Sequence, residues 1–338
     1  MDASLSNLGI GWYHWLMQCM DKADIKVGMR VLVRCDLDVP IKAGEIVETF
    51  RLNASLKTLS YIINLGGIPV IAGHLGRPGG KVVPELSTSQ LKPYFDANLQ
   101  GDYELLENLR FDPREETNDP IFAKELAQKG AIYVNESFAT CHRESASITG
   151  IASLLPSYAG FQLVKEVETL KKILVDPARP LLAIIGGAKI ESKKTVIKKF
   201  TELADGVLVG GRLALEEPIT MDKVYAPVDY IDGKDIGPKT LEKWREMILS
   251  AKTIVWAGPM GLFEEDRYSE GTRRVGKLIV EAVNRGCFAV AGGGDTVTAL
   301  HKFRLFDEFS FVSTGGSAML DFLVYGTLPG IEALCQKN

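Results

Sequence analysis

Five basic side chains lie in or near loops that follow short apolar runs in the first half of the sequence. They are Arg51, His74, Arg77, Arg110 and Arg143. Arginine makes planar, two-pronged hydrogen bonds to carboxylate and phosphate, and each charge-assisted contact contributes about 1.5–3 kcal/mol. A surface ion pair is the ordinary explanation for any one arginine alone. Four at successive strand ends favour a binding site for a small, strongly anionic metabolite.

Glycine clusters occupy the corresponding positions in the second half of the chain. They are Gly186-Gly187, Gly210-Gly211, Gly292-Gly293-Gly294 and Gly315-Gly316. Glycine lets the backbone approach a phosphate closely, and a helix that begins next supplies N–H groups and a positive dipole end. A single glycine pair after a strand is more often a tight turn. Several together, with Lys189, Lys193, Asp295 and Thr296 nearby, favour a site for a nucleotide phosphate chain.

The standard nucleotide and nucleophile motifs are missing from the sequence. A near match to the P-loop begins at Gly271, but Leu278 stands where Ser or Thr should hold magnesium. No G-x-G-x-x-G follows a strand-like run and no protein-kinase catalytic loop is present, which disfavours a Rossmann dehydrogenase and a protein kinase. Cys141 and His142 are neighbours, but adjacent loop side chains rarely face each other, which disfavours a cysteine nucleophile.

Short β-branched runs that alternate with helix-like stretches carry all these residues. Such alternation is typical of parallel sheets covered by helices, in which ligands bind at the carboxyl ends of the strands. The runs are 29–36, 68–77, 103–111 and 131–138 in the first half, and 181–189, 206–211, 253–261, 288–296 and 309–316 in the second. Between the two groups, Leu163, Val167, Leu170 and Leu174 recur at helical spacing, which predicts one helix joining two domains.

Composition agrees with a two-domain globular protein. The chain has 338 residues and a net charge of −4, which demands neither a nucleic acid nor a membrane partner. Its five cysteines are scattered, which disfavours a disulfide framework and a zinc knuckle and favours a reducing, cytoplasmic setting. The apolar stretch 8–20 lacks a basic leading region and is too short to cross a bilayer.

An anion-binding domain and a nucleotide-binding domain that face one another across a cleft suit phosphoryl transfer. The transition state of that reaction spreads negative charge over the migrating group, so catalysis consists mostly of positioning and cationic stabilisation. Closure about the connecting helix would exclude water that could otherwise accept the phosphoryl group.

The sequence resembles phosphoglycerate kinase, the glycolytic family that moves a phosphoryl group between 1,3-bisphosphoglycerate and ADP. The resemblance extends from about Lys26 to the C-terminus. It rests on nine collinear segments: RVLVRCDLDVP, GHLGRP, LLENLRF, VNESFATCHR, GGAKIESK, DIGPKT, VWAGPMGLFE, GGGDTVTA and STGGSAMLD. It implies two doubly wound parallel-sheet domains joined by a hinge helix, Mg²⁺ bound with ADP or ATP, and a monomer.

The resemblance also implies roles for individual residues. Arg51 is expected to stabilise the transferring phosphoryl group, Lys193 to act on the nucleotide phosphates, and Asp295 to lie near Mg²⁺. The implied triose-binding residues are Asp36, Leu37, Asp38, Arg51, His74, Leu75, Gly76, Arg77, Arg110 and Arg143. The implied nucleotide-binding residues are Gly187, Lys189, Lys193, Gly210, Gly233, Pro259, Glu264, Gly292, Gly293, Gly294, Asp295, Thr296, Gly315 and Gly316.

The predicted domain organisation has five parts. They are an N-terminal extension (1–25), a triose-phosphate domain (26–160), an inter-domain helix (161–177), a nucleotide-binding domain (178–320) and a C-terminal segment returning toward the first domain (321–338). Only 25 residues separate Gly211 from Gly237, where the family carries several dozen more, including a wall of the adenine pocket. The second domain is therefore expected to be shortened and to hold the base loosely.

Four substitutions depart from the family pattern. Asp38 and Ala257 each stand where the family has Asn, Ser192 replaces an Asp, and Ser317 replaces the third Gly of STGGG. A carboxylate at position 38 beside an anionic substrate should weaken binding. Two hypotheses follow: a working, shortened phosphoglycerate kinase, or a non-catalytic relative that binds a phosphorylated metabolite or a protein.

Overall fold

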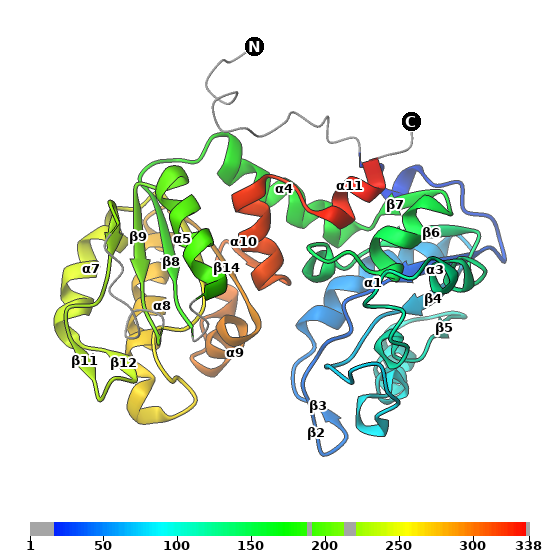
Figure 1. Ribbon diagram of the computed structural model, residues 1–338, viewed down its shortest axis with the longest axis horizontal. Coiled ribbons are helices and arrows are strands. Elements are labelled where there is room, and N and C mark those ends of the chain that lie inside the picture. The colour runs from blue at the N-terminus through cyan, green and yellow to red at the C-terminus, as the bar shows by residue number, and fades with distance from the viewer. Residues whose placement is uncertain (1–16, 188–190, 213–220, 336–338) are drawn as a thin grey trace, which may run out of the picture. The chain divides into compact units, whose positions relative to one another are not determined.

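Two separate parallel sheets organise the chain in the computed structural model, which describes residues 17–187, 191–212 and 221–335. The chain forms two compact units. The first consists of two segments, one that ends at Glu168 and one that begins at Thr327, and the second is Thr169–Gly326. Both sheets are built from strands that alternate with helices (Figure 1). The α/β fold class predicted from the sequence is confirmed.

The first sheet has five strands in the order β5-β4-β1-β6-β7, all parallel. They are β1 (Arg30–Arg34), β4 (Ile68–Ala72), β5 (Glu104–Leu105), β6 (Ile132–Asn135) and β7 (Ser157–Ala159). Central β1 pairs with β4 and β6 and is buried from Val31 to Arg34, because helices cover both faces of the sheet. The three-residue strand β7 has too little sequence pattern to be predicted.

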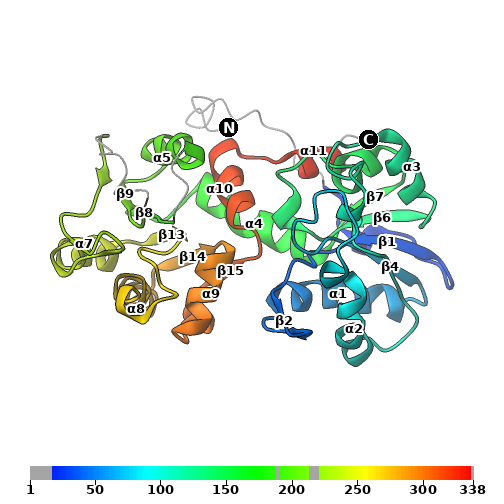
Figure 2. The ribbon, with the colours of Figure 1, turned by 60° about the horizontal axis from the view of Figure 1, so that its bottom comes forward.

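Helices lie on both faces of this sheet, with α1 and α2 on one side and α3 on the other (Figure 2). The helices of the first unit are α1 (Phe50–Asn64), α2 (Lys92–Asn98), α3 (Pro120–Ala127) and α11 (Pro329–Cys335), and a small hairpin joins β2 (Ile41–Lys42) to β3 (Glu45–Ile46). Asp119 caps α3 by accepting the N–H groups of Ile121 and Phe122, and Pro120 starts its first turn.

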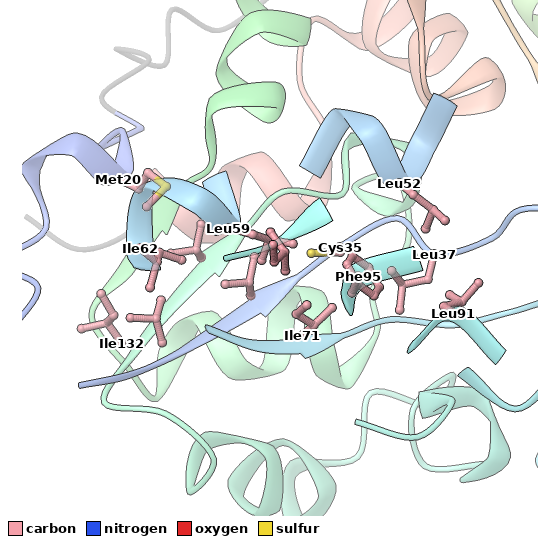
Figure 3. Packing of buried hydrophobic residues seen from close by; sticks show 14 of the residues in the cluster. Met20, Cys35, Leu37, Leu52, Leu59, Ile62, Ile71, Leu91, Phe95 and Ile132 are labelled. Atoms are coloured by element: carbon pink, nitrogen blue, oxygen red, sulfur yellow. The ribbon is translucent and has the colours of Figure 1, made fainter. Parts of the chain in front are cut away.

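The core of the first unit lies between β1, α1 and α2 (Figure 3). Leu59 of α1 and Phe95 of α2 are fully buried there. Met20 joins the same core, and Cys19 forms a parallel bridge to Ala159 at the edge of the sheet. Residues 17–23, which the sequence suggests are part of an extension, are therefore packed on this unit.

The second sheet has six parallel strands in the order β10-β9-β8-β13-β14-β15. They are β8 (Leu181–Ile185), β9 (Gly206–Val209), β10 (Val224–Tyr225), β13 (Thr253–Ala257), β14 (Phe288–Gly292) and β15 (Phe311–Ser313). Its helices are α5 (Glu191–Leu203), α7 (Pro238–Ser250), α8 (Glu270–Asn284), α9 (Gly294–Lys302) and α10 (Gly316–Tyr325), and β11 (Tyr230–Ile231) pairs with β12 (Asp235–Ile236). Figure 2 shows α5 and α10 on one face and α7, α8 and α9 on the other.

One helix, α4 (Phe161–Val175), begins in the first unit and continues into the second. Leu163, Val167 and Leu170 are buried along it, at the helical spacing that predicts the helix. Within the described ranges, no individual helix is long and apolar enough to cross a membrane, and only the broken pair α10 and α11 passes that test together.

Candidate functional site

The predicted anion-binding residues gather at the carboxyl ends of the first sheet. Asp36, Leu37 and Asp38 follow β1, and His74 to Arg77 follow β4. Arg51 lies in the first turn of α1, and Arg110 lies in the short helix η5 (Leu109–Phe111) after β5. Parallel strands place these loops at one edge of the sheet, as the sequence predicts.

Arg51 lies between two carboxylates. Its Nε is 3.4 Å from Asp36 Oδ2, its Nη1 is 3.7 Å from Asp38 Oδ2, and the same Nη1 donates to the Asp38 carbonyl at 2.7 Å. Asp36 is buried, and burial raises the pKa of its carboxyl while Arg51 opposes that shift. The Asp36 carboxylate, for its part, raises the pKa of Arg51. The guanidinium is thus charged and held in one orientation.

His74 is buried and neutral. Burial, followed by the charges of nearby arginines, lowers its pKa well below the usual range. Arg34 Nη2 lies 3.0 Å from His74 Nδ1, and because guanidinium is only a donor, that nitrogen accepts and the proton is on Nε2. Nε2 is 3.9 Å from Asp38 Oδ2. His74 therefore presents an uncharged N–H donor toward the anion-binding residues.

Arg110 is fixed against the β4 loop. Its Nη1 donates to the Gly76 carbonyl at 3.0 Å and its Nε pairs with Glu116 at 3.3 Å. The Gly76 N–H in turn donates to Asp38 Oδ1 at 2.8 Å. A small polar pocket beside Arg110 is also lined by Arg34 and the exposed Arg143. Arg110 therefore connects two groups of residues: hydrogen bonds link it through Gly76 to Asp38, and it lines a pocket together with Arg143.

Three predicted residues of the same loops have other surroundings. Leu37 and Leu75 are almost completely buried, and Leu37 is part of the core between β1, α1 and α2. Their side chains hold the loops to the sheet, and their carbonyls accept from the Val39 N–H at 2.9 Å and from Asn108 Nδ2 at 2.8 Å. Arg77 is exposed on the β4 loop.

Sequence reasoning missed Arg34, which organises the site from within the sheet. Arg34 is 2% exposed and donates its Nε to Ser147 Oγ at 2.9 Å. The Ser147 hydroxyl donates to Glu115 at 2.6 Å, so a buried chain of polar groups leads from Glu115 to His74. The available signal was an arginine inside the otherwise apolar run VLVRC, since buried charges are paired or functional.

The glycine-rich strand ends of the second sheet are packed backbone to backbone. A Cβ added to Gly258 would lie 2.2 Å from the Gly186 carbonyl oxygen, and one added to Gly316 would lie 2.3 Å from Gly293 Cα. The Gly187 N–H donates to the Pro259 carbonyl at 2.9 Å. These glycines let neighbouring loops meet at a distance that no side chain would allow.

Two helices begin beside this contact, and neither start is covered by a capping side chain. Gly293, with φ of 111°, precedes α9, and Gly315 precedes α10. A helix start without a side-chain cap offers N–H groups and a positive dipole end to an anion. Asp295 is exposed in the first turn of α9, whereas Thr296 is buried and its Oγ1 accepts the Gly258 N–H at 2.8 Å. Gly292, Gly294 and Gly315 complete the predicted cradle.

The other predicted nucleotide residues lie around the same edge of the second sheet. Gly210 follows β9 and Pro259 follows β13, where it is buried. Gly233 lies in the exposed turn between β11 and β12, and Glu264 is exposed after β13. Lys189 lies outside the described residues, and Lys193 lies in α5 with a side chain that is also outside them. The α5 end of the cradle is therefore defined by sequence alone.

Within the described residues, no three His, Cys, Asp or Glu side chains converge as a metal-ion cluster. Mg²⁺ is usually held by one or two carboxylates together with substrate phosphates rather than by an all-protein cage. A single exposed carboxylate, Asp295, at an uncapped helix start fits that kind of binding.

Comparison with known proteins gives one consistent result. The family model described as phosphoglycerate kinase matches residues 20–216 and 216–325. The phosphoglycerate kinase of Dictyoglomus turgidum is 37% identical over 387 residues, covering 93% of this chain and 97% of that protein. The one from Thermosipho africanus is 36% identical over 390 residues, with the same coverage. These alignments are longer than the 338-residue chain, so both relatives carry residues that this chain lacks.

Solved structures agree with the sequence matches. The phosphoglycerate kinase of Coxiella burnetii is 30% identical, with a TM-score of 0.77 over 95% of this chain and 99% of that chain. The one from Pyrococcus horikoshii is 28% identical, with a TM-score of 0.81 over 94% of this chain and 98% of that chain. The two matched segments of the family model meet at residue 216, inside the stretch between Gly211 and Gly237 that is short in this sequence.

Proposed function

Because this chain belongs to the phosphoglycerate kinase family, we propose that its first unit binds the triose substrate and its second unit the nucleotide. The chain is a kinase of glycolysis that transfers a phosphoryl group reversibly between 1,3-bisphosphoglycerate and ADP, giving 3-phosphoglycerate and ATP. Nothing in the comparisons favours the non-catalytic alternative. The observation that supports the assignment of the units is the cluster of Arg51, His74 and Arg110 at one edge of the first sheet.

On the triose side, Arg51 is assigned to the transferring phosphoryl group. Its guanidinium is held by Asp36 and Asp38, so the remaining N–H groups keep their direction when negative charge develops. His74 donates from Nε2 without carrying a charge, while Arg77, Arg110 and Arg143 attract the distant phosphate. A substrate with a phosphate at one end and an acyl phosphate or carboxylate at the other suits this division.

On the nucleotide side, the α9 start and the glycine contacts at Gly293 and Gly316 are assigned to the phosphates. Lys193 and Lys189 are assigned to the same phosphates on sequence grounds. Mg²⁺, when bound, neutralises phosphate charge, and Asp295 is the residue that would hold it. Gly187, Gly210, Gly233, Pro259 and Glu264 are assigned to the nucleoside end. The segment that the family has after Gly211 is short here. We therefore propose that this domain distinguishes only weakly between adenine and other bases.

A coupled assay with 1,3-bisphosphoglycerate and MgADP tests the residue assignments. Arg51→Ala should reduce kcat by at least a hundredfold, because removing one preorganised charge donor costs about 2.7–4 kcal/mol in the transition state. Lys193→Ala should have a similar effect. Arg304→Ala, a substitution of an exposed residue just after the end of α9, should leave kcat unchanged and serves as the control. Near-normal turnover in Arg51→Ala would remove that residue from the reaction.

The remaining features of the proposal concern the setting of the enzyme. We assign a cytoplasmic monomer whose partners are its small-molecule substrates, without nucleic acid or membrane. We also propose the domain boundaries. The triose-phosphate domain is 26–160 and the nucleotide-binding domain is 178–320. The connecting helix is 161–177, and the segment 321–338 returns to the first domain. Light scattering of the purified chain at assay concentration tests the monomer.

A further inference from the structure

The carboxyl group of Glu136 is buried at the end of β6, where it faces the start of α4. Glu136 is 2% exposed, and its Oε2 accepts the N–H of Gln162 at 3.1 Å and of Leu163 at 3.2 Å. These two amides belong to the first turn of α4 and have no partner within the helix. The carboxyl group at this position caps the helix by accepting N–H groups that the helix itself leaves without acceptors.

Thr58 of α1 completes the cap. Its buried hydroxyl accepts the N–H of Phe161 at 3.0 Å and donates to Glu136 Oε1. The next amide, Val164, bonds to the Gly160 carbonyl at 3.0 Å. The first four N–H groups of α4 therefore all have an acceptor. Glu136 accepts two of them, Thr58 accepts one, and the Gly160 carbonyl accepts the fourth.

The contact leaves no spare room. A Cβ added to Gly160 would lie 2.0 Å from Glu136 Oε2, and Gly160 is itself tied to the Asn135 carbonyl at 2.8 Å. Burial raises the pKa of Glu136 to about 8, and the Thr58 hydroxyl and the Gln162 and Leu163 N–H groups oppose that shift. Lys57, beside Thr58, stands over the Phe161 ring at 4.7 Å. The start of α4 is therefore held in one position relative to β6 and α1.

Both helices that meet here have a role in the proposed reaction. Arg51 lies in the first turn of α1, seven residues before Thr58, on the same rigid helix. Helix α4 starts at this contact and continues into the nucleotide-binding unit. Neither Glu136 nor Thr58 is part of the anion-binding residues described above.

We propose that Glu136 and Thr58 are positioning residues, which fix the helix carrying Arg51 to the helix that leads into the nucleotide-binding unit. This inference rests on the proposed function of Arg51. Triose binding needs the first unit alone, whereas phosphoryl transfer needs Arg51 to be aligned with a nucleotide held by the second unit. Loosening the contact should therefore lower kcat while sparing triose affinity.

The test compares Thr58→Val, which loses the hydroxyl and keeps the shape, with Thr58→Ser, which keeps the hydroxyl. Thr58→Val should lower kcat at least fivefold, with the Kd of 3-phosphoglycerate, titrated without nucleotide, within twofold of wild type. Thr58→Ser should have kcat within twofold of wild type. Thr240→Val is the matched control: Thr240 is a buried threonine of α7 whose hydroxyl bonds to Asp229, and its loss should lower Tm without changing kcat.

Glu136→Gln provides a second variant if Thr58→Val does not fold, because the amide keeps one acceptor oxygen and the size of the side chain. Its kcat should also fall at unchanged triose affinity. Unchanged kcat in both variants, or a loss of triose affinity parallel to the loss of kcat, would overturn the proposal. Near-normal turnover in Arg51→Ala would instead refute the assignment of Arg51, so the two failures are distinguishable.

Discussion

Asp38→Asn tests the electrostatics of the anion-binding residues most directly. The Asp38 carboxylate lies 3.7 Å from Arg51 Nη1 and 3.9 Å from His74 Nε2, so it occupies the cationic guanidinium and the neutral N–H donor that are proposed to bind the substrate. The amide of Asn can still accept the Gly76 N–H that Asp38 now accepts at 2.8 Å. The substitution therefore removes one negative charge and keeps the loop contact.

The size of the effect follows from distance and exposure. A substrate anion on the far side of the Arg51 guanidinium would lie roughly 7 Å from the Asp38 carboxylate, where unit charges repel by about 0.6 kcal/mol in water and about 2.4 kcal/mol at an effective dielectric constant of 20. The Asp38 side chain is 39% exposed, so solvent screening favours the lower part of that interval. We expect 3-phosphoglycerate to bind about three- to tenfold more tightly, or about 0.6–1.4 kcal/mol.

Isothermal titration of 3-phosphoglycerate into wild type and Asp38→Asn measures this difference. Asp102→Asn, an exposed carboxylate elsewhere on the first unit, is the matched control for the loss of one charge and should change Kd by less than twofold. The gain should shrink as salt is raised, because the repulsion is screened. An unchanged or weaker affinity in Asp38→Asn would show that the carboxylate is accommodated and that the repulsion argument is wrong.

Three further predictions concern other parts of the molecule. Unfolding free energy should fall as the pH is lowered from 7 to 5, in part because the unfolded chain takes up a proton at His74 that the folded chain excludes. His74→Gln should have a pH dependence shallower by up to about 1.4 kcal/mol per pH unit in denaturant titrations, and an identical slope would contradict the neutral histidine. Gly316→Ala should weaken ADP binding at least tenfold without changing triose affinity, because its Cβ would meet Gly293 Cα at 2.3 Å; normal ADP binding would separate this contact from the nucleotide site. The ratio of kcat/KM for ADP over GDP should be below about ten, because the short segment between Gly211 and Gly237 supplies few contacts that could select adenine, and strong adenine preference would show that the base is held.

Sequence pattern predicted the parallel sheets because buried strands such as β1 and β13 are nearly continuous apolar runs ending in polar or glycine residues. The position of Arg51, His74 and Arg110 at one edge of the first sheet was predictable for the same reason, since the end of each strand marks that edge. Arg34 was not, because its partners Ser147 and Glu115 are far from it in sequence and only the fold brings them together. The same holds for Glu136 and Thr58, whose importance depends on where α4 begins.

The path of the chain through the first unit has a consequence for biosynthesis. This unit is completed by α11, where the Gly330 N–H bonds to the Cys141 carbonyl at 2.8 Å and Ile331 and Leu334 are buried. All of Thr169–Gly326 is translated before that helix exists. The second unit is contiguous in sequence and can finish folding first, whereas the first unit leaves the ribosome with an uncovered apolar face until its last helix arrives.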